Sequence, residues 1–439
     1  MEQRRGRPRL VQALLDSLRV PDLRRRILFT ILILAIARFI AHVPMPGVNE
    51  EALRELFERN ELLGMLDLFS GGLLANASIA PLGVYPYITA IIIMQLLTPA
   101  IPALQRLAQE GEWGRQRITL YTYIMTAPLA MLQGYGHLVL FAREGVIELG
   151  GALSTITLLF CIAAGTMLLV WLGDRITEHG VGNGISLIIF AGIVARIPAN
   201  IKRIELSIGP QGVLIIALLT ALFTIFIVYF TEAYRQIPIQ YSRAIYRGGR
   251  TFRQVGTSYL PLKVNSAGMI PLIFAMSVIM LPGTIAGYFA GRSGLAATIQ
   301  NLFSPAGSYG GAFYWVPYFF LVVGFTFFYT MILFQQQNIP EVLQRQGGFI
   351  PGIRPGKPTA DYLTRVLSRI TWAGALGLGI VALMPLFTRW MIGNPAGTNP
   401  EGLMIISSAG LLIVVGVVID TLRQLEAQLA MRQYEGFLR

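Results

Sequence analysis

Apolar segments about 20 residues long recur along the whole chain, and this is the length that an α-helix needs to cross a bilayer. Of the 439 residues, 54% are hydrophobic and only 13% are charged, whereas soluble domains carry about 25% charged residues. The pattern predicts an all-α polytopic membrane protein with ten transmembrane helices, at residues 24–42, 76–97, 118–138, 152–172, 184–200, 212–231, 265–287, 313–334, 372–390 and 402–420.

Lys and Arg are unevenly distributed between the loops on the two sides of these spans. The loops of the side that holds both termini contain 26 of the 35 Lys and Arg residues, and the opposite loops contain 7. Because Lys and Arg concentrate in cytoplasmic loops, both termini are expected in the cytoplasm. The two largest loops of that side, 233–264 and 335–371, mix Arg with Gly, Pro and aromatic residues. They suit either anionic lipid head groups or a large acidic partner.

A short internal repeat suggests how the spans are grouped. Residues 83–88 and 268–273 both read G-x-x-P-x-I, in the second and seventh spans. The two copies are offset by five spans, an odd number, so the halves would be inverted repeats with a site near the midplane, although chance matching of Gly-rich helices is an alternative. The expected organisation is a first half at 1–200 (spans one to five), span six at 201–232, a basic loop at 233–264, spans seven and eight at 265–334, a basic loop at 335–371, spans nine and ten at 372–420, and a cytoplasmic tail at 421–439.

The predicted spans lack the groups that membrane chemistry requires. Their middles contain essentially no Asp or Glu, and the chain has three His and one Cys, so no cofactor, metal site or catalytic residue is expected. Arg38, near the end of the first span, is expected to snorkel or to pair with a backbone carbonyl. No nucleotide-binding P-loop is present either. A secondary transporter or an intramembrane enzyme is therefore disfavoured, and energy for transport would come from outside the chain.

Branched aliphatic residues follow the repeated glycines. Ordinary core packing accounts for most such residues in helices. The alternative is a ring at a constriction between the halves, which would exclude water and ions by dewetting. Its members would be Val84, Ile88, Ile185, Ile189, Ile273 and Ile413.

The stretch GMLDLFSGGLLANAS before the second span is too short and too small in residue size to cross a bilayer. Irregular backbone at membrane depth survives only inside protein or beside a water-filled cavity. Residues of about 62–75 are therefore expected to re-enter the membrane as a plug, with Gly71 and Gly72 as the hinge and Leu66 and Phe69 among the plug residues.

Four long motifs resemble the SecY/Sec61 family of protein-conducting channels. They are SGGLLANASIAPLGVYPYITAIIIMQLL (70–97), WLGDRITEHGVGNGISLIIFAGI (171–193), LPLKVNSAGMIPLIFA (260–275) and GGFIPGIRPGKPT (347–359). The resemblance covers essentially the whole chain. It implies a clamshell of spans 1–5 and 6–10 around an hourglass pore, closed by the plug and by the aliphatic ring, in which Val84 replaces the more usual Ile.

The resemblance also implies further sites. A lateral gate toward lipid would carry Thr89, Gln95 and Asn265. The basic loops would dock a driving partner through Arg243, Arg247, Arg250, Arg354 and Lys357, although Thr251 stands where related chains have a second arginine.

The implied function is that of a passive, gated conduit in the cell inner membrane. It would move unfolded secretory preproteins across the membrane, respond to signal peptides and release transmembrane segments sideways into the membrane lipids. The SecA motor or the translating ribosome would drive it, and the small subunits SecE and SecG would accompany it.

Overall fold

Two compact units make up the computed structural model of the chain, which describes residues 20–59, 63, 67, 70–148, 150–247, 250–289, 294–303, 311–392 and 406–437. The first unit comprises Met1–Gly209 and Ile405–Arg439, and the second comprises Pro210–Met404. The boundary after Gly209 lies close to the division expected at residue 200, and the last helix belongs to the first unit. The grouping of spans into two five-helix halves stays a prediction.

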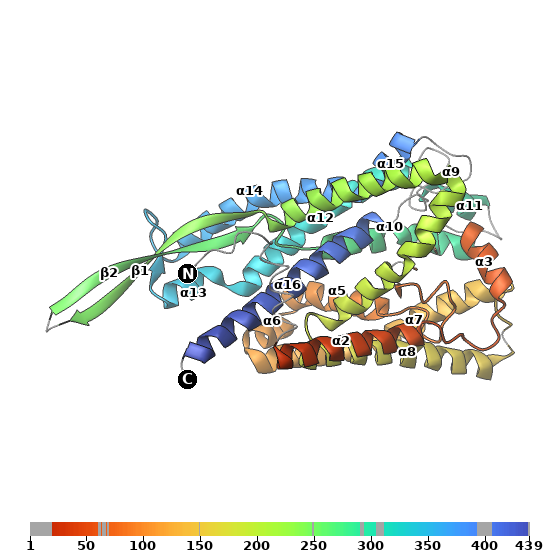
Figure 1. Cartoon of the computed structure of the whole chain (residues 1–439), viewed down its shortest axis with the longest axis horizontal. Coiled ribbons are helices and arrows are strands. Elements are labelled where there is room, and N and C mark those ends of the chain that lie inside the picture. The colour runs from red at the N-terminus through yellow and green to blue at the C-terminus, as the bar shows by residue number, and fades with distance from the viewer. Residues whose placement is uncertain are drawn as a thin grey trace. The chain divides into compact units, whose positions relative to one another are not determined.

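Helices account for most of the first unit, and α7 packs against α5 and α8 while α8 also packs against α2. The helices are α2 (Pro21–Ile40), α3 (Glu50–Arg59), α5 (Tyr85–Ala100), α6 (Pro102–Gln109), α7 (Glu112–Arg143), α8 (Ala152–His179), the first part of α9 (Gly184–Glu232) and α16 (Ser408–Phe437) (Figure 1).

The chain bends by 99° between α5 and α6. Ile101 at the bend has extended backbone angles, φ −105° and ψ 113°. Pro102 follows it, and proline disfavours the helical conformation in the residue before it. The bend therefore follows directly from the sequence and sets where α5 ends.

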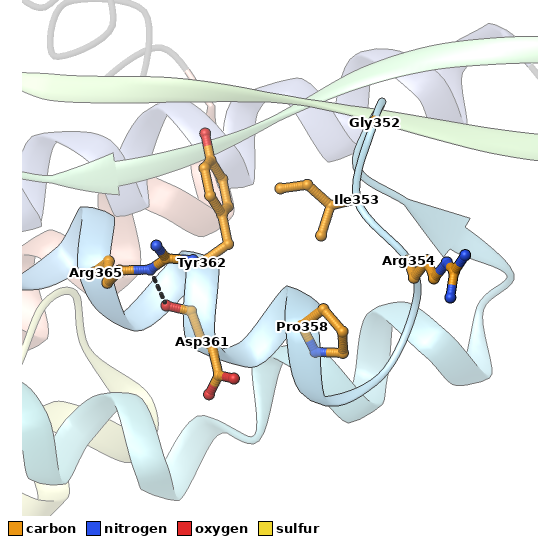
Figure 2. A pocket seen from close by; sticks show the side chains of 7 residues that line it. All are labelled: Gly352, Ile353, Arg354, Pro358, Asp361, Tyr362 and Arg365. Carbon is orange, nitrogen blue, oxygen red and sulfur yellow. Dashed lines mark hydrogen bonds between the residues drawn. The ribbon is translucent and has the colours of Figure 1, made fainter.

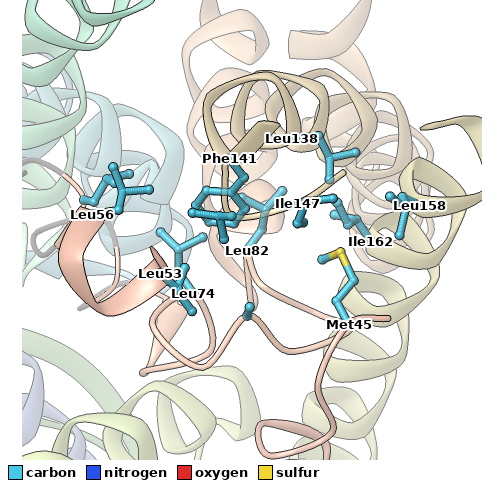
Figure 3. Packing of buried hydrophobic residues seen from close by; sticks show 13 residues of the cluster. Met45, Leu53, Leu56, Leu74, Leu82, Leu138, Phe141, Ile147, Leu158 and Ile162 are labelled. Carbon is cyan, nitrogen blue, oxygen red and sulfur yellow. The ribbon is translucent and has the colours of Figure 1, made fainter. Parts of the chain in front are cut away.

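An apolar cluster surrounds the irregular chain on either side of the Gly-rich stretch. Figure 3 shows side chains of α3, of residues 74–82 and of the facing ends of α7 and α8 turned toward one another. Two isolated β-bridges, Pro44 to Ser78 and Val48 to Ile147, tie the same loops together. The buried members of the cluster are Met45, Leu53, Leu56, Leu63, Leu74, Ala77, Leu82, Leu138, Phe141, Val146, Ile147, Leu158 and Ile162.

Helix α9 contains a single break, at Gly209, where the backbone has φ 80° and ψ 177°. This conformation suits glycine because a side chain would be strained at positive φ. The fifth and sixth predicted spans thus lie on the two helical parts of α9, before and after Gly209, and helix occupies most of the loop expected between them.

The second unit is built around α12, which packs against α10 and α14. Glycines on α14 allow close packing, because a Cβ on Gly377 or Gly379 would collide with the ring of Phe230 or Phe319 respectively. Besides the second part of α9, its helices are α10 (Ile270–Phe289), α11 (Gly294–Leu302), α12 (Ala312–Gln337), α13 (Ile339–Arg345), α14 (Lys357–Ala382) and α15 (Met384–Ile392).

A β-hairpin occupies the first basic loop, where the sequence analysis expected no strand. Strand β1 (Tyr234–Arg247) pairs antiparallel with β2 (Arg250–Lys263), and the short β3 (Gly348–Phe349) pairs with the other edge of β1. The hairpin extends beyond the helices of its unit (Figure 1). Its base is held by a cluster of buried side chains from the hairpin, α13, the residue after β3 and α14, namely Ile237, Ile239, Leu262, Leu343, Ile350, Leu363, Val366 and Ile370.

Several helices are long and apolar enough to cross a membrane. Among the described residues, six helices meet this criterion, and the bent pair α5 and α6 makes a seventh. One of the six is α9, which covers two predicted spans, and the stretch Ile270–Ile279 of α10 is apolar as well. The fold is that of a mostly helical, multi-pass membrane protein, and the count of ten spans stays a prediction.

Gly184→Ala is expected to destabilise the first unit. The turn from α8 to α9 brings Gly184 so close to the carbonyl oxygen of Gly173 that a Cβ would collide with it. Overpacking of this kind typically costs about 1–3 kcal/mol. Thermal unfolding of the purified protein in detergent should show a lower midpoint. The matched control is Gly416→Ala, whose Cβ would have nothing within 4 Å, and an equal midpoint for both variants would contradict the packing.

Candidate functional site

The Gly-rich stretch before α5 has a backbone that only glycine adopts readily. Gly71 and Gly72 have φ values of 71° and 91°, in the left-handed region that disfavours other residues. The N–H of Gly72 donates to the backbone oxygen of Asp67 at 3.0 Å. These contacts define a compact element, called here the glycine segment, which consists of Asp67 and residues 70–75.

The glycine segment lies backbone to backbone against two other parts of the first unit. A Cβ on Gly192 of α9 would lie 2.5 Å from the Cα of Gly71, and one on Gly83 would lie 2.6 Å from the backbone oxygen of Ser70. Cβ atoms essentially never approach other atoms so closely. The glycines at 192 and 83 therefore form a seat that fits this segment only while they carry no side chain.

Asp67 organises the glycine segment from within. Its side chain is only 1% exposed, and its Oδ1 accepts hydrogen bonds from the Ser70 hydroxyl at 3.0 Å and the Ala75 N–H at 2.9 Å. The Ser70 hydroxyl in turn accepts from the N–H of Leu74 at 3.1 Å. The other carboxylate oxygen, Oδ2, forms an ion pair with Arg196 of α9.

Arg38 approaches the glycine segment from α2. Its guanidinium donates a hydrogen bond to the backbone oxygen of Gly71 at 2.9 Å, so the expected pairing with a backbone carbonyl is confirmed. Two arginines from two helices thus hold one short segment, the first through a carbonyl and the second, Arg196, through a carboxylate.

The first unit carries five of the six residues assigned to the aliphatic ring. Val84 precedes α5 as its N-cap and is buried, Ile88 is half-buried on α5, and Ile413 is buried on α16. On α9, Ile189 is buried, and Ile185 is half-buried and close to Gly173 of α8. The sixth residue, Ile273, is buried on α10 of the second unit. Their assembly into one ring stays a prediction.

The remaining plug and gate residues are placed only in part. Leu66 and Phe69 lie outside the described residues. The hydroxyl of Thr89 donates to the Tyr85 carbonyl within α5 at 3.1 Å. Gln95 on α5 and Asn265 in the second unit each bury a side-chain oxygen that has no hydrogen-bond partner among the described residues. Their roles in a lateral gate stay a prediction.

The basic residues expected to dock a partner lie on two surfaces of the second unit. Arg243, Arg247 and Arg250 belong to the hairpin strands, and their side chains lie outside the description. Arg354 is exposed on the loop that leads into α14, and Lys357 is exposed at the first position of α14.

A shallow pocket of about 330 Å³ lies behind that loop. Figure 2 shows Ile353 and Tyr362 facing one another inside the pocket while Arg354 points away from them, to the outer side of the loop. The lining residues are Gly352, Ile353, Arg354, Pro358, Asp361, Tyr362 and Arg365. The loop thus presents the guanidinium of Arg354 outward, and its role in docking a partner stays a prediction.

Comparison with known proteins identifies the family. A model of the SecY family matches residues 78–422. The protein translocase subunit SecY of Streptomyces galbus is 40% identical, over 98% of this chain and 100% of its own length. This chain belongs to the SecY family.

Solved channels share its fold. A SecY structure in which the plug domain stabilises the closed state and maintains a membrane seal matches with a TM-score of 0.59 and 18% identity, over 92% of this chain and 91% of that one. Sec61 in the canine ribosome–channel complex from the endoplasmic reticulum matches with a TM-score of 0.58 and 17% identity, over the same shares. The mostly helical fold is therefore that of the SecY and Sec61 channels.

Two polar contacts within this SecY-family fold were not found from the sequence. One is the ion pair of Asp67, which the sequence analysis counted only as part of a plug range. The other joins α7 to α8, where the hydroxyl of Tyr123 donates to Asp174 Oδ2 at 2.7 Å while its ring stacks on Tyr87 of α5 with centroids 5.6 Å apart. In both contacts an acidic residue lies beside an apolar span in the sequence, and this pattern is the signal that could have pointed to them.

Tyr123→Phe is expected to loosen the packing of α5, α7 and α8. The change removes the hydrogen bond to Asp174 but keeps the ring, and loss of a hydrogen bond to a charged group costs about 1.5–3 kcal/mol. Thermal unfolding in detergent should show a lower midpoint than for Tyr121→Phe, the matched change at an exposed neighbour on the same helix. If both variants unfold at the wild-type midpoint, the hydrogen bond contributes nothing to stability.

Proposed function

We propose that this chain is the central pore-forming subunit of a protein-conducting channel. It moves unfolded secretory polypeptides across the membrane and releases transmembrane segments laterally into lipid. The observation that carries the proposal is the 40% identity to a protein translocase subunit over essentially both full lengths. In this proposal the chain provides a gated path, and a partner outside the chain supplies the energy for transport.

The proposed architecture has ten spans in two inverted five-helix halves around an hourglass pore. Support comes from the internal G-x-x-P-x-I repeat, from helices in each of the ten expected ranges, and from the likeness to solved channels. The pore ring is proposed at Val84, Ile88, Ile185, Ile189, Ile273 and Ile413. Burial of four of them supports this assignment, because a dewetted constriction needs apolar side chains shielded from lipid.

The proposed plug includes the glycine segment. Its support is the irregular backbone beside α5, enclosed by protein as backbone at membrane depth must be, and the plug domain of the related SecY channel. The lateral gate is proposed at Thr89, Gln95 and Asn265. The buried side-chain oxygens of Gln95 and Asn265, which have no hydrogen-bond partner among the described residues, support it, since a buried unsatisfied polar atom calls for a structural or functional reason.

The proposed driver docks on the two basic surfaces of the second unit. The exposed side chains of Arg354 and Lys357 support this, as does the ribosome bound to the related canine channel. The SecA motor is proposed as the alternative driver, and SecE and SecG as companion subunits. The proposed location is the cell inner membrane with both termini in the cytoplasm, as the distribution of Lys and Arg indicates.

Photo-crosslinking from Ile189 tests the proposed function. With a photo-reactive residue at this position and a stalled secretory chain, we expect capture of the translocating chain, because the buried Ile189 would line the pore. The control position is Phe160, which is 61% exposed on α8 and would face lipid. Capture of neighbouring helices or lipid alone at Ile189 would contradict the proposed path.

Arg354→Glu is expected to weaken docking of the driver by at least about tenfold, because reversing a contact charge replaces attraction with repulsion. Membrane insertion and thermal stability should stay unchanged, since the side chain is exposed. Binding of SecA and of ribosomes to the reconstituted protein measures the effect. Arg115→Glu, an equal charge reversal at an exposed residue of α7, is the control. Equal binding by both variants would remove Arg354 from the docking surface.

A further inference from the structure

The ion pair between Asp67 and Arg196 is placed where its formation is costly. Asp67 is 1% exposed, while the Arg196 side chain is 27% exposed. Burying a carboxylate removes it from water, and the penalty is offset only when a charged partner and hydrogen bonds replace the solvent. Asp67 has a charged partner in Arg196 and hydrogen bonds from Ser70 and Ala75 of its own segment.

The two carboxylate oxygens of Asp67 face different partners. Oδ1 is bound by Ser70 and Ala75, which are members of the glycine segment. Oδ2 is bound by Arg196 of α9. The internal contacts are therefore independent of the external one, and the segment keeps its own hydrogen bonds if it leaves α9.

Arg38 adds a second external contact of a different kind. It binds the carbonyl oxygen of Gly71, a backbone atom, at 2.9 Å. Gly71 itself lies against Gly192, one turn before Arg196 on the same face of α9. The two arginines and the glycine contact thus form one continuous attachment of the segment to α2 and α9.

We propose that Arg196 and Arg38 are positioning residues that latch the glycine segment onto α9 and α2, and that channel opening requires the Asp67–Arg196 ion pair and the Arg38–Gly71 hydrogen bond to break together. This inference rests on the proposed function, in which the glycine segment belongs to the plug. Arg196 sets how rarely the segment leaves its seat when no substrate is present.

Thiol labelling measures release of the segment without relying on conduction. Leu73 is 4% exposed, so a cysteine there is hidden while the segment is seated. The background is Cys161→Ser with Leu73→Cys in the full-length chain, held in lipid nanodiscs so that a water-soluble maleimide reaches both faces. Arg196→Gln should raise the labelling rate at least about tenfold, because an uncompensated buried charge strongly disfavours the seated state.

Three further variants separate a latch from a general loss of stability. Arg203→Gln removes an equal charge from an exposed site on α9 and should leave labelling unchanged. Arg196→Lys retains the charge and should restore slow labelling in large part. In a double-mutant cycle, Asp67→Asn with Arg196→Gln should label little faster than the faster single variant, because coupled partners are not additive.

Resting conductance of the same variants in planar bilayers tests whether the latched segment is also the plug that closes the channel. Faster labelling together with more frequent spontaneous opening supports both the latch and the plug. Faster labelling with unchanged conductance supports the latch and overturns the plug role of the segment. Unchanged labelling of Arg196→Gln overturns the latch, whatever the conductance, and leaves crosslinking from Ile189 as the separate test of the channel.

Discussion

Enclosure of irregular backbone by protein is the constraint on which the first unit depends. Residues between Gly71 and α5 form turns instead of a helix, and at the membrane depth proposed for them a bilayer would offer their N–H and C=O groups no water. The turns satisfy many of these groups locally, as between Ser78 and Leu73, and others reach the chain before α3, as between Ile79 and Val43. Apolar side chains of α3, α7 and α8 then cover the turns. The helices of this unit thus serve as walls for a non-helical element.

Glycine at a few positions makes that enclosure tight. Gly71 and Gly192 place two backbones in contact, and Gly173 and Gly184 do the same where α8 turns into α9. The loop between α8 and α9 is also bound in its middle, because Thr30 of α2 accepts the N–H of Val181 and Gln424 of α16 accepts the N–H of Gly182. Close backbone contact suits a membrane interior, where van der Waals packing replaces the hydrophobic effect between helices.

Local pattern revealed much of the helical part of this fold, because a span needs only a run of apolar residues. The bend at Pro102 was not predicted, although a proline is a local signal for one. Arg38 was also predictable, since a lone cation in a span must find an acceptor. The hairpin could not be predicted in the same way, because its strands are largely polar. They are ordered by pairing with each other and by burial of Ile237 and Ile239 at the base of the hairpin. The ion pair of Asp67 with Arg196 was not predicted for a similar reason, because no local pattern relates residues so far apart in the sequence.

A polar attachment has a different energetic character from an apolar one. A buried ion pair contributes little net stability compared with apolar side chains of the same size, yet losing one partner costs about 3–5 kcal/mol. An apolar plug seat would weaken gradually as contacts slide apart, whereas separation of Asp67 from Arg196 is penalised at once. If the segment leaves its seat as proposed, breaking this ion pair would add to the barrier between the seated and the released state. In the plug role proposed for it, the segment would have to seal a membrane at rest and still yield to a passing chain, and a polar attachment would serve both needs.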